Sequence, residues 1–148
     1  MAATTVTRIA SRSNPVLVRV RRLQADPLAY RKLGQVWLEG DHLLRAAVTR
    51  GWRLPIVLLS EDDADDVAWQ PLCAAAGKAL LVEPRLWHET SALASPVPVA
   101  ALVDLPAPSL TPGRRTLVLD RIQDSGNLGS MLRSAAALER EVMLLGMG

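Results

Sequence analysis

The sequence predicts a protein of the α/β class, followed by a shorter α/β segment near its C-terminal end. Over residues 14–105, apolar strand-like runs alternate with helical stretches at close spacing. Residues 106–115, rich in Pro, Ser and Gly, resemble an inter-domain linker, and residues 116–148 begin a new strand–loop–helix–strand pattern. Such alternation is typical of helices that cover a mostly parallel sheet. We therefore expect an α/β/α sandwich joined by a linker to a second α/β unit.

The first half of the chain opens with a polar arm and then alternates helix and strand. Residues 1–13 are small and polar, so we expect a flexible arm. Asn14 as N-cap and Pro15 in the first turn predict a helix from residue 14. A second helix of about ten residues is predicted between Asp41 as N-cap and Gly51 as C-cap. The flanking runs "GQVWLEG" and "LPIVLLS" read as strands.

The same alternation continues up to the linker. The stretch "EDDADDVAWQPLCAAAGK" predicts a helix that starts with acidic residues, is broken near Pro71 and ends at Gly77. A strand "ALLVE", a short helix "PRLWHETSAL" and a strand "VPVAALVDL" follow. Four strands and four helices of this kind are enough to build a core.

After the linker the pattern is strand "TLVLD", loop "RIQDSG", helix "NLGSMLRSAAAL" and strand "EVMLLG". Asn127 is the predicted N-cap of a helix over 128–138, and its apolar residues form a stripe that we expect to be buried. Two parallel strands and one helix do not make a stable sheet domain alone. Residues 116–148 are therefore expected to open a domain whose remainder is missing.

Charge is segregated along the chain although the net charge is only +2. Residues 1–60 carry ten Lys and Arg against three Asp and Glu, and residues 61–110 carry two against eight. A basic segment that includes Arg19 and Arg22 can follow a phosphate backbone. The alternative is a solvated charged face with no ligand, and composition does not decide between the two.

Several other classes of site lack support. One cysteine, Cys73, excludes an internal disulfide framework and indicates a reducing compartment, so we expect the cytoplasm. The acidic run at 61–66 has no spaced ligand set and predicts a solvated helix start with no metal site. No apolar run is long enough to span a membrane. Trp52 between Arg50 and Arg53 is a candidate RNA contact, although a tryptophan is more often a core anchor.

The start of the last predicted helix offers a specific site. Side chains four apart on a helix share a face and lean toward its N-terminus, so Arg133 should lie over Gly129. Because glycine has no side chain, the guanidinium can reach the helix start beside Asn127. A helix N-terminus with an added cation accepts phosphate or another anion. The alternative is an ordinary β-α-β crossover with a solvent-exposed arginine.

The segment "LVLDRIQDSGNLGSMLRSAAAL" resembles the first signature motif of the SpoU/TrmH family of RNA ribose 2′-O-methyltransferases, in the SPOUT superfamily. That motif is a strand ending in Asp, followed by D-P-x-N-x-G-x-x-x-R-x-A. The residues in register are Asp124, Asn127, Gly129, Arg133 and Ala135. Ser125 stands where proline is usual. The preceding segment "GQVWLEGDHLLRAAVTRGWRLPIVLLS" is similar to the family's substrate-binding domain of ribosomal-protein L30e type, with Glu39 and Gly40 as the main matches.

The resemblance implies a fold and an activity. Residues 14–105 would be an L30e-like RNA-binding α/β/α sandwich, and residues 116–148 the first β-α-β of the knotted SPOUT domain. The family transfers a methyl group from S-adenosylmethionine to a ribose 2′-hydroxyl of rRNA or tRNA, and its full-length members are expected to be homodimers. Its second and third motifs, which hold the cofactor, do not occur in these 148 residues. We therefore expect this chain alone to be inactive and assign no residue to the cofactor; the alternative function is a non-catalytic L30e-like RNA-binding module.

The resemblance also implies residue roles. Arg133 matches the family's catalytic arginine and would hold a phosphate beside the target ribose or stabilise negative charge on its 2′-oxygen. Asn127 would orient the ribose or Arg133, and Gly129 would belong to the RNA-binding residues. Glu39 matches a recurrent acidic residue of the RNA-binding domain, and its alternative role is to cap the next helix.

Overall fold

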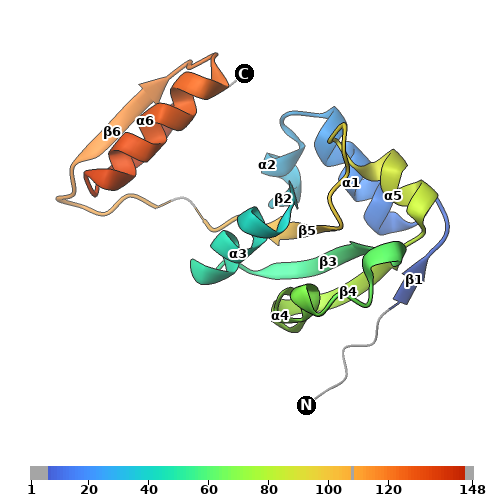
Figure 1. Ribbon diagram of the computed structural model, residues 1–148. Helices are drawn as coiled ribbons and strands as arrows, with labels where there is room; N and C mark the ends of the chain where they lie inside the picture. Colours follow the sequence, from blue (N-terminus) through green and yellow to red (C-terminus); the bar gives the residue numbers. More distant parts are fainter. Residues whose placement is uncertain (1–6, 108, 146–148) are drawn as a thin grey trace. The chain divides into compact units, whose positions relative to one another are not determined.

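The structure is a computed structural model that describes residues 7–107 and 109–145. It divides the chain into two compact units, residues 1–106 and residues 107–148 (Figure 1). Each unit has its own sheet among the described residues.

Unit 1 contains a five-stranded sheet in the order β1-β4-β3-β5-β2 (Figure 1). The strands are β1 Thr7–Ile9, β2 Gln35–Glu39, β3 Leu54–Ser60, β4 Ala76–Val82 and β5 Val99–Asp104. The pairs β1–β4 and β3–β4 are parallel, whereas β5 is antiparallel to both β3 and β2. Four strands therefore run in one direction and β5 alone opposes them. The predicted α/β class with a mostly parallel sheet is confirmed.

The prediction of a flexible arm over residues 1–13 is wrong for residues 7–9, which form strand β1. Residues 7–9 pair in parallel register with residues 80–82, and Ile9 is only 2% exposed. A strand of three residues is too short to show a period, which is why the sequence did not indicate it. The rest of the predicted arm includes residues 1–6, which lie outside the described residues.

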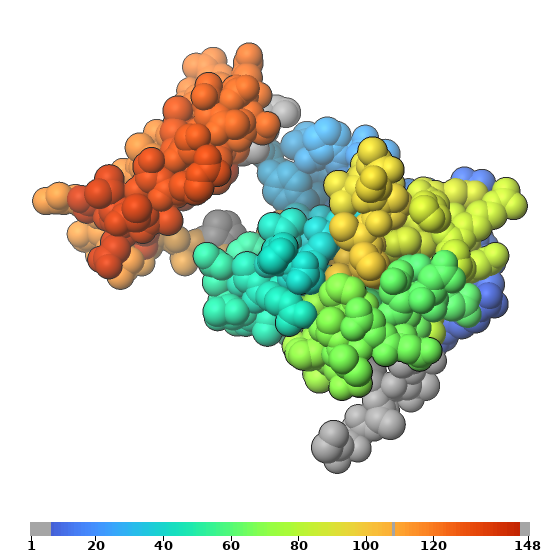
Figure 2. All heavy atoms as spheres, viewed as in Figure 1, coloured from blue at the N-terminus to red at the C-terminus, as the bar shows by residue number. Residues whose placement is uncertain are grey.

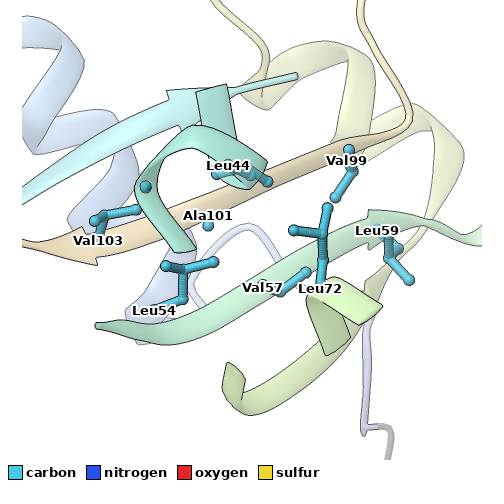
Figure 3. Packing of buried hydrophobic residues seen from close by; sticks show 9 residues of the cluster. Leu44, Leu54, Val57, Leu59, Leu72, Val99, Ala101 and Val103 are labelled. Carbon is cyan, nitrogen blue, oxygen red and sulfur yellow. The ribbon is translucent and has the colours of Figure 1, made fainter. Parts of the chain in front are cut away.

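Helices cover both faces of this sheet. On one face α3 (Asp41–Thr49) and α4 (Gln70–Ala75) pack on side chains of β3 and β5 (Figure 3). On the other face α1 (Pro15–Ala25) and α5 (Pro84–Thr90) pack on β1, β3 and β4. The alternation along β5 separates the two cores, since Val99, Ala101 and Val103 face α3 and α4 while Ala100 faces α1 and α5. The short helix α2 (Ala29–Leu33) contacts α1 and β2.

The predicted caps are partly confirmed. The side chain of Asn14 accepts a hydrogen bond from the Val16 backbone N–H at 2.9 Å, and Pro15 opens α1. At α3, however, the N-cap is Gly40 with φ 99°, and Asp41 is the first helical residue. The ladder with β5 extends to the Gly40 N–H, which donates to Val99 O at 2.9 Å. The chain must therefore turn at Gly40, where glycine tolerates the positive φ.

The helix predicted over residues 61–77, with a break near Pro71, is wrong. Two 3₁₀ turns, Glu61–Asp63 (η1) and Val67–Trp69 (η2), precede α4, and Pro71 lies in the first turn of α4 instead of breaking it. Gly77 belongs to β4, where a Cβ would lie 2.9 Å from the Pro55 carbonyl oxygen. The glycine is therefore required by the close approach of β3 and does not mark a helix end.

Unit 2 is a β-α-β arrangement, as predicted. Its strands β6 (Thr116–Asp120) and β7 (Glu141–Leu145) pair in parallel, and α6 (Ser125–Ala137) connects them. The predicted buried stripe of α6 is wrong for most of its members. Ala135 is 3% exposed, but Leu138 is 64% exposed. Two strands form too narrow a sheet to cover a helix of this length.

Candidate functional site

The start of α6 differs from the prediction by three residues. Asp124 is the N-cap, and its Oδ1 accepts a hydrogen bond from the Asn127 backbone N–H at 2.6 Å. Asn127 is thus the third residue of the helix and not its cap. Aspartate and asparagine are about equally good N-caps, so the sequence alone did not separate the two positions. The Asn127 side chain remains exposed at the first turn.

Arg133 lies along α6 toward this helix start. Its Nη1 is 3.3 Å from the position that a Cβ on Gly129 would occupy. Its Nη2 donates to Ser130 Oγ at 3.1 Å, and Ser130 Oγ in turn donates to the Gly126 carbonyl oxygen at 3.0 Å. This is the placement that the helical spacing of Arg133 and Gly129 predicts. Sequence reasoning missed Ser130, although a hydroxyl three residues before an arginine on a helix was a usable signal.

The electrostatics of the α6 start favour an anion. Within residues 7–107 and 109–145, Arg133 forms no ion pair, so its charge is available to a ligand. The nearby Arg121 is instead paired with Asp120 at 3.1 Å. Arg121 also has φ 48°, an uncommon backbone conformation for a non-glycine residue, and it follows β6 directly. The site thus combines a helix N-terminus with one permanent cation at the C-terminal end of a strand, where open α/β sheets bind ligands.

Glu39 has a structural role that the sequence did not indicate. Its Oε1 accepts from Trp37 Nε1 at 2.9 Å and from the Ala92 backbone N–H at 2.8 Å, and its Oε2 accepts from Ser91 Oγ. The alternative role as a helix cap is wrong, because α3 has no side-chain cap. Glu39 ties the segment after α5 to the end of β2. Figure 2 shows this segment, in yellow, against the cyan surface around β2 and α3.

The arginines predicted to bind RNA in unit 1 are all exposed, namely Arg19, Arg22, Arg50 and Arg53. Arg19 Nη1 donates to Gln35 Oε1 at 3.1 Å, and Gln35 Nε2 donates to Asp104 Oδ1 at 2.8 Å. The Asp104 backbone N–H donates to the Arg53 carbonyl oxygen at 3.0 Å. The structure therefore brings Arg19 and Arg53 to the same end of the sheet, and Arg22 follows one helical turn after Arg19.

Arg50 and Trp52 lie in the connection between α3 and β3. Arg50 Nη1 donates to the Ala46 carbonyl oxygen at 3.3 Å. Trp52 is half-buried and packs against the core under α3. With Leu38 and Leu43 these two residues line an apolar hollow of about 290 Å³. Trp52 thus serves as a core anchor with one side of its ring toward this hollow.

The structure does not support a nucleophilic cysteine, a metal site or a membrane-spanning helix among the described residues. Burial raises the pKa of the half-buried Cys73 thiol, which disfavours a nucleophilic thiolate. Among the described residues, no three His, Cys, Asp or Glu side chains come together as a metal site requires. No helix in the described ranges is long and apolar enough to cross a membrane.

Unit 2 has a hollow of about 500 Å³, which is lined by Ser109, Leu110, Val142, Met143 and Leu144. Adenosine and an amino-acid group require several precisely placed polar partners, and Ser109 is the one polar side chain of this lining. The described residues of unit 2 therefore do not fit S-adenosylmethionine by themselves, and none is assigned to it.

The chain is similar to known proteins in sequence and in fold. No family model matches the chain. An uncharacterised tRNA/rRNA methyltransferase of Synechocystis sp. is 30% identical over 137 residues, which cover 89% of this chain and 50% of the relative. The 23S rRNA (guanosine(2553)-2′-O)-methyltransferase RlmP of Bacillus subtilis is 26% identical over 113 residues, or 75% of this chain and 43% of the relative.

The solved structure of the SpoU methyltransferase AviRb from Streptomyces viridochromogenes, in complex with AdoMet, superposes with a TM-score of 0.73. It is 23% identical and aligns with 88% of this chain and 52% of AviRb, so it supports the fold. A putative RNA methyltransferase of the TrmH family from Porphyromonas gingivalis is 26% identical, with a TM-score of 0.66 over 91% of this chain and 53% of that structure. The chain is thus similar in sequence to RNA methyltransferases and has the fold seen in the SpoU and TrmH-family structures. It spans about half the length of the curated relatives it matches.

Proposed function

We propose that the chain acts as the RNA-binding domain and first catalytic motif of a SpoU/TrmH-type methyltransferase that modifies a ribose 2′-hydroxyl of rRNA or tRNA. The observation that carries this proposal is the Arg133 guanidinium, held over Gly129 at the start of α6. The relatives support it because they align with the greater part of the chain. Because the alignments cover most of the chain, they favour a methyltransferase over a non-catalytic RNA-binding module, which would not need the motif of unit 2.

In this proposal Arg133 acts as a fixed cation. Arginine stays protonated at every physiological pH, so it is unsuited to abstracting a proton. Its planar fork can instead hold the phosphate beside the target ribose and stabilise negative charge growing on the 2′-oxygen. Ser130 limits the directions in which the guanidinium can turn, and the exposed Asn127 amide orients the ribose. S-adenosylmethionine supplies the methyl group in this family.

In the same proposal the exposed arginines of unit 1 hold the RNA backbone. Arg19 and Arg53 at one end of the sheet, with Arg22 on the same helix, provide phosphate contacts, and Arg50 adds another beside Trp52. We further propose a cytoplasmic location and, for the full-length form, a homodimer. Glu39 contributes indirectly, since both of its carboxylate oxygens are used within unit 1.

The test is RNA binding by the whole chain, with Arg133→Ala and Arg133→Lys as variants. We expect binding of rRNA and tRNA transcripts whose affinity falls as salt rises. Arg133→Ala should weaken binding, and Arg133→Lys should recover it only in part because lysine lacks the bidentate fork. In a longer protein that methylates RNA, Arg133→Ala should abolish ribose methylation without unfolding the protein. Undetectable binding to both RNAs, or unchanged methylation by Arg133→Ala, would contradict the proposal.

A further inference from the structure

Strand β2 forms one edge of the five-stranded sheet, and no described strand pairs with its outer side. Its hydrogen bonds to β5 follow an alternating pattern. The Gly40 N–H donates to Val99 O, and the Gly34 carbonyl accepts from the Leu105 N–H, both at 2.9 Å. In an antiparallel ladder, hydrogen-bonded and non-hydrogen-bonded residue pairs alternate. These two hydrogen bonds therefore determine which residues of β2 direct their backbone groups toward β5.

From this alternation, residues 36 and 38 also direct their backbone groups toward β5. The backbone N–H and C=O groups of Gln35, Trp37 and Glu39 point away from the sheet. Their outward amides have no protein partner within the described ranges. An edge with unpaired donors and acceptors is a template for a ligand that carries matching groups.

A groove follows this edge. It has a volume of about 390 Å³ and is lined by β2 together with α1, α2, α3 and the segment after α5. Four consecutive residues, 36–39, line it, and their side chains alternate between the two faces of the sheet, so the groove lies along the edge of the strand. Tyr30 and Trp37 supply aromatic surface, while Leu43 and Leu93 remain 54% and 44% exposed.

Exposed arginines on α1, the helix that borders the groove, favour an anionic occupant. Arg19, Arg22 and the groove-lining Leu23 share one stripe of α1, since they are three and four residues apart. Arg19 is anchored to Gln35, the first residue of β2. The one carboxylate in the lining, Glu39, already accepts hydrogen bonds with both oxygens. A basic rim over an aromatic and apolar floor matches single-stranded nucleic acid, whose phosphates and bases need these two surfaces.

We propose that the groove along the outer edge of β2 binds an unpaired stretch of RNA, with one base hydrogen-bonded to the backbone N–H and C=O of Trp37. Unpaired bases expose a hydrogen-bonding edge with donors next to acceptors, and the two outward groups of one strand residue match such a pair. The inference rests on the proposed RNA-binding function. It adds the location of the single strand and the way in which a base is read.

The test is residue-resolved amide hydrogen exchange of the whole chain, alone and with single-stranded oligoadenylate or oligocytidylate. In the free protein the amides of Val36 and Leu38 should exchange slowly and those of Trp37 and Glu39 quickly. Oligonucleotide binding should slow the Trp37 amide by about tenfold, in line with one added hydrogen bond. It should leave Val36 and Leu38 nearly unchanged, because they are already bonded to β5.

Two exposed positions give a matched pair of variants for the affinity measurement. Leu43→Glu places a negative charge in the groove and should weaken oligonucleotide binding by about tenfold or more. Val67→Glu, at a residue that is 71% exposed and does not line the groove, should leave the affinity unchanged. Equal affinities of these two variants would overturn the proposal.

The exchange data separate this inference from the proposed function. If RNA binds without slowing exchange of the Trp37 amide, the groove is not the RNA site, and the proposed function still stands. No binding to oligonucleotides, rRNA or tRNA would overturn both. Protection of the same amides by polyglutamate and not by RNA would show that the groove takes an acidic peptide, and would overturn RNA as its occupant.

Discussion

Strands and helices alternate along the chain in both unit 1 and unit 2, but the two units are stabilised in different ways. Unit 1 buries apolar side chains on both faces of its sheet. Among residues 109–145, only Leu119 and Ala135 are buried apolar residues. Unit 1 is thus held by burial, whereas unit 2 depends on local signals such as the Asp124 cap. The difference explains why the motif residues of unit 2 are accessible to a ligand.

The largest expected effect comes from removing core volume in unit 1. Leu58→Ala, at a fully buried residue of β3, should lower the free energy of unfolding by about 2–5 kcal/mol. All four tryptophans, at positions 37, 52, 69 and 87, lie in unit 1, so tryptophan fluorescence during urea denaturation reports on this unit. Leu119→Ala in unit 2 should leave that transition in place. A shift of similar size for both variants would show that the two units unfold as one.

One carboxylate in each unit anchors a loop by accepting a hydrogen bond from a backbone N–H. Glu39 accepts from Ala92 in unit 1, and Glu141 accepts from Thr111 in unit 2. Glu39→Gln should cost about 1–3 kcal/mol, since an amide group replaces an oxygen that accepts from donors in a partly buried setting. Urea denaturation measures this cost, and faster exchange of the Ala92 amide should accompany it.

Glu141→Gln is the matched variant in unit 2. Its effect should be confined to faster exchange of the Thr111 amide, because the carboxylate is solvent-accessible and its loss leaves no buried donor unpaired. An unfolding midpoint for Glu39→Gln that equals the wild-type value would contradict the anchoring role of Glu39.

The sequence predicted most of the fold because the signals of unit 1 are strong. Runs such as "LPIVLLS" are long, apolar and bounded by breakers, and Asn14 with Pro15 marks a helix start unambiguously. Two errors occurred where a local pattern allows two assignments. Asp124 or Asn127 can each cap α6, and Gly77 is equally consistent with a helix end or a tight strand contact. Tertiary contacts decide these cases, and a local pattern does not contain them.

The candidate site was predicted in part for the same reason. The reach of Arg133 over Gly129 follows from helical geometry alone and was available from the spacing. The hydrogen bonds of Glu39 join residues more than fifty positions apart, and the shared end of the sheet for Arg19 and Arg53 depends on the strand order. No periodicity in the sequence encodes either of these long-range relations.

A smaller effect is expected from adding a methyl group at Gly129, in α6 of unit 2. Gly129→Ala should not destabilise α6, because alanine is favoured over glycine within a helix by about 0.5–1 kcal/mol. The added Cβ, 3.3 Å from Arg133 Nη1, should nevertheless displace the guanidinium and weaken RNA binding several-fold. Ser134→Ala is the control, since it raises helix propensity at an exposed position without approaching Gly129. Unchanged RNA affinity for Gly129→Ala would show that the open space above Gly129 has no functional role.

The smallest expected effect is a pH dependence at the other end of the chain. Arg8 donates to both carboxylate oxygens of Glu61, at 2.6 and 2.9 Å, and these bonds hold the pKa of Glu61 below its usual value. A lowered folded-state pKa means that the contribution to stability is complete above the ordinary glutamate pKa of about 4.3 and is lost as the pH falls through the lowered value. Because the pair is exposed, this contribution is small.

The Glu83 amide reports on the pair, since it donates to the Ile9 carbonyl oxygen at 3.1 Å and so registers the pairing of β1 with β4. Its protection factor should fall below about pH 4 in the wild type. In Glu61→Gln it should be lower at neutral pH and show no such step. The Thr111 amide should show a step in the same pH range, because its hydrogen bond lowers the pKa of Glu141. A step that persists at Glu83 in Glu61→Gln would assign the pH dependence to a different carboxylate.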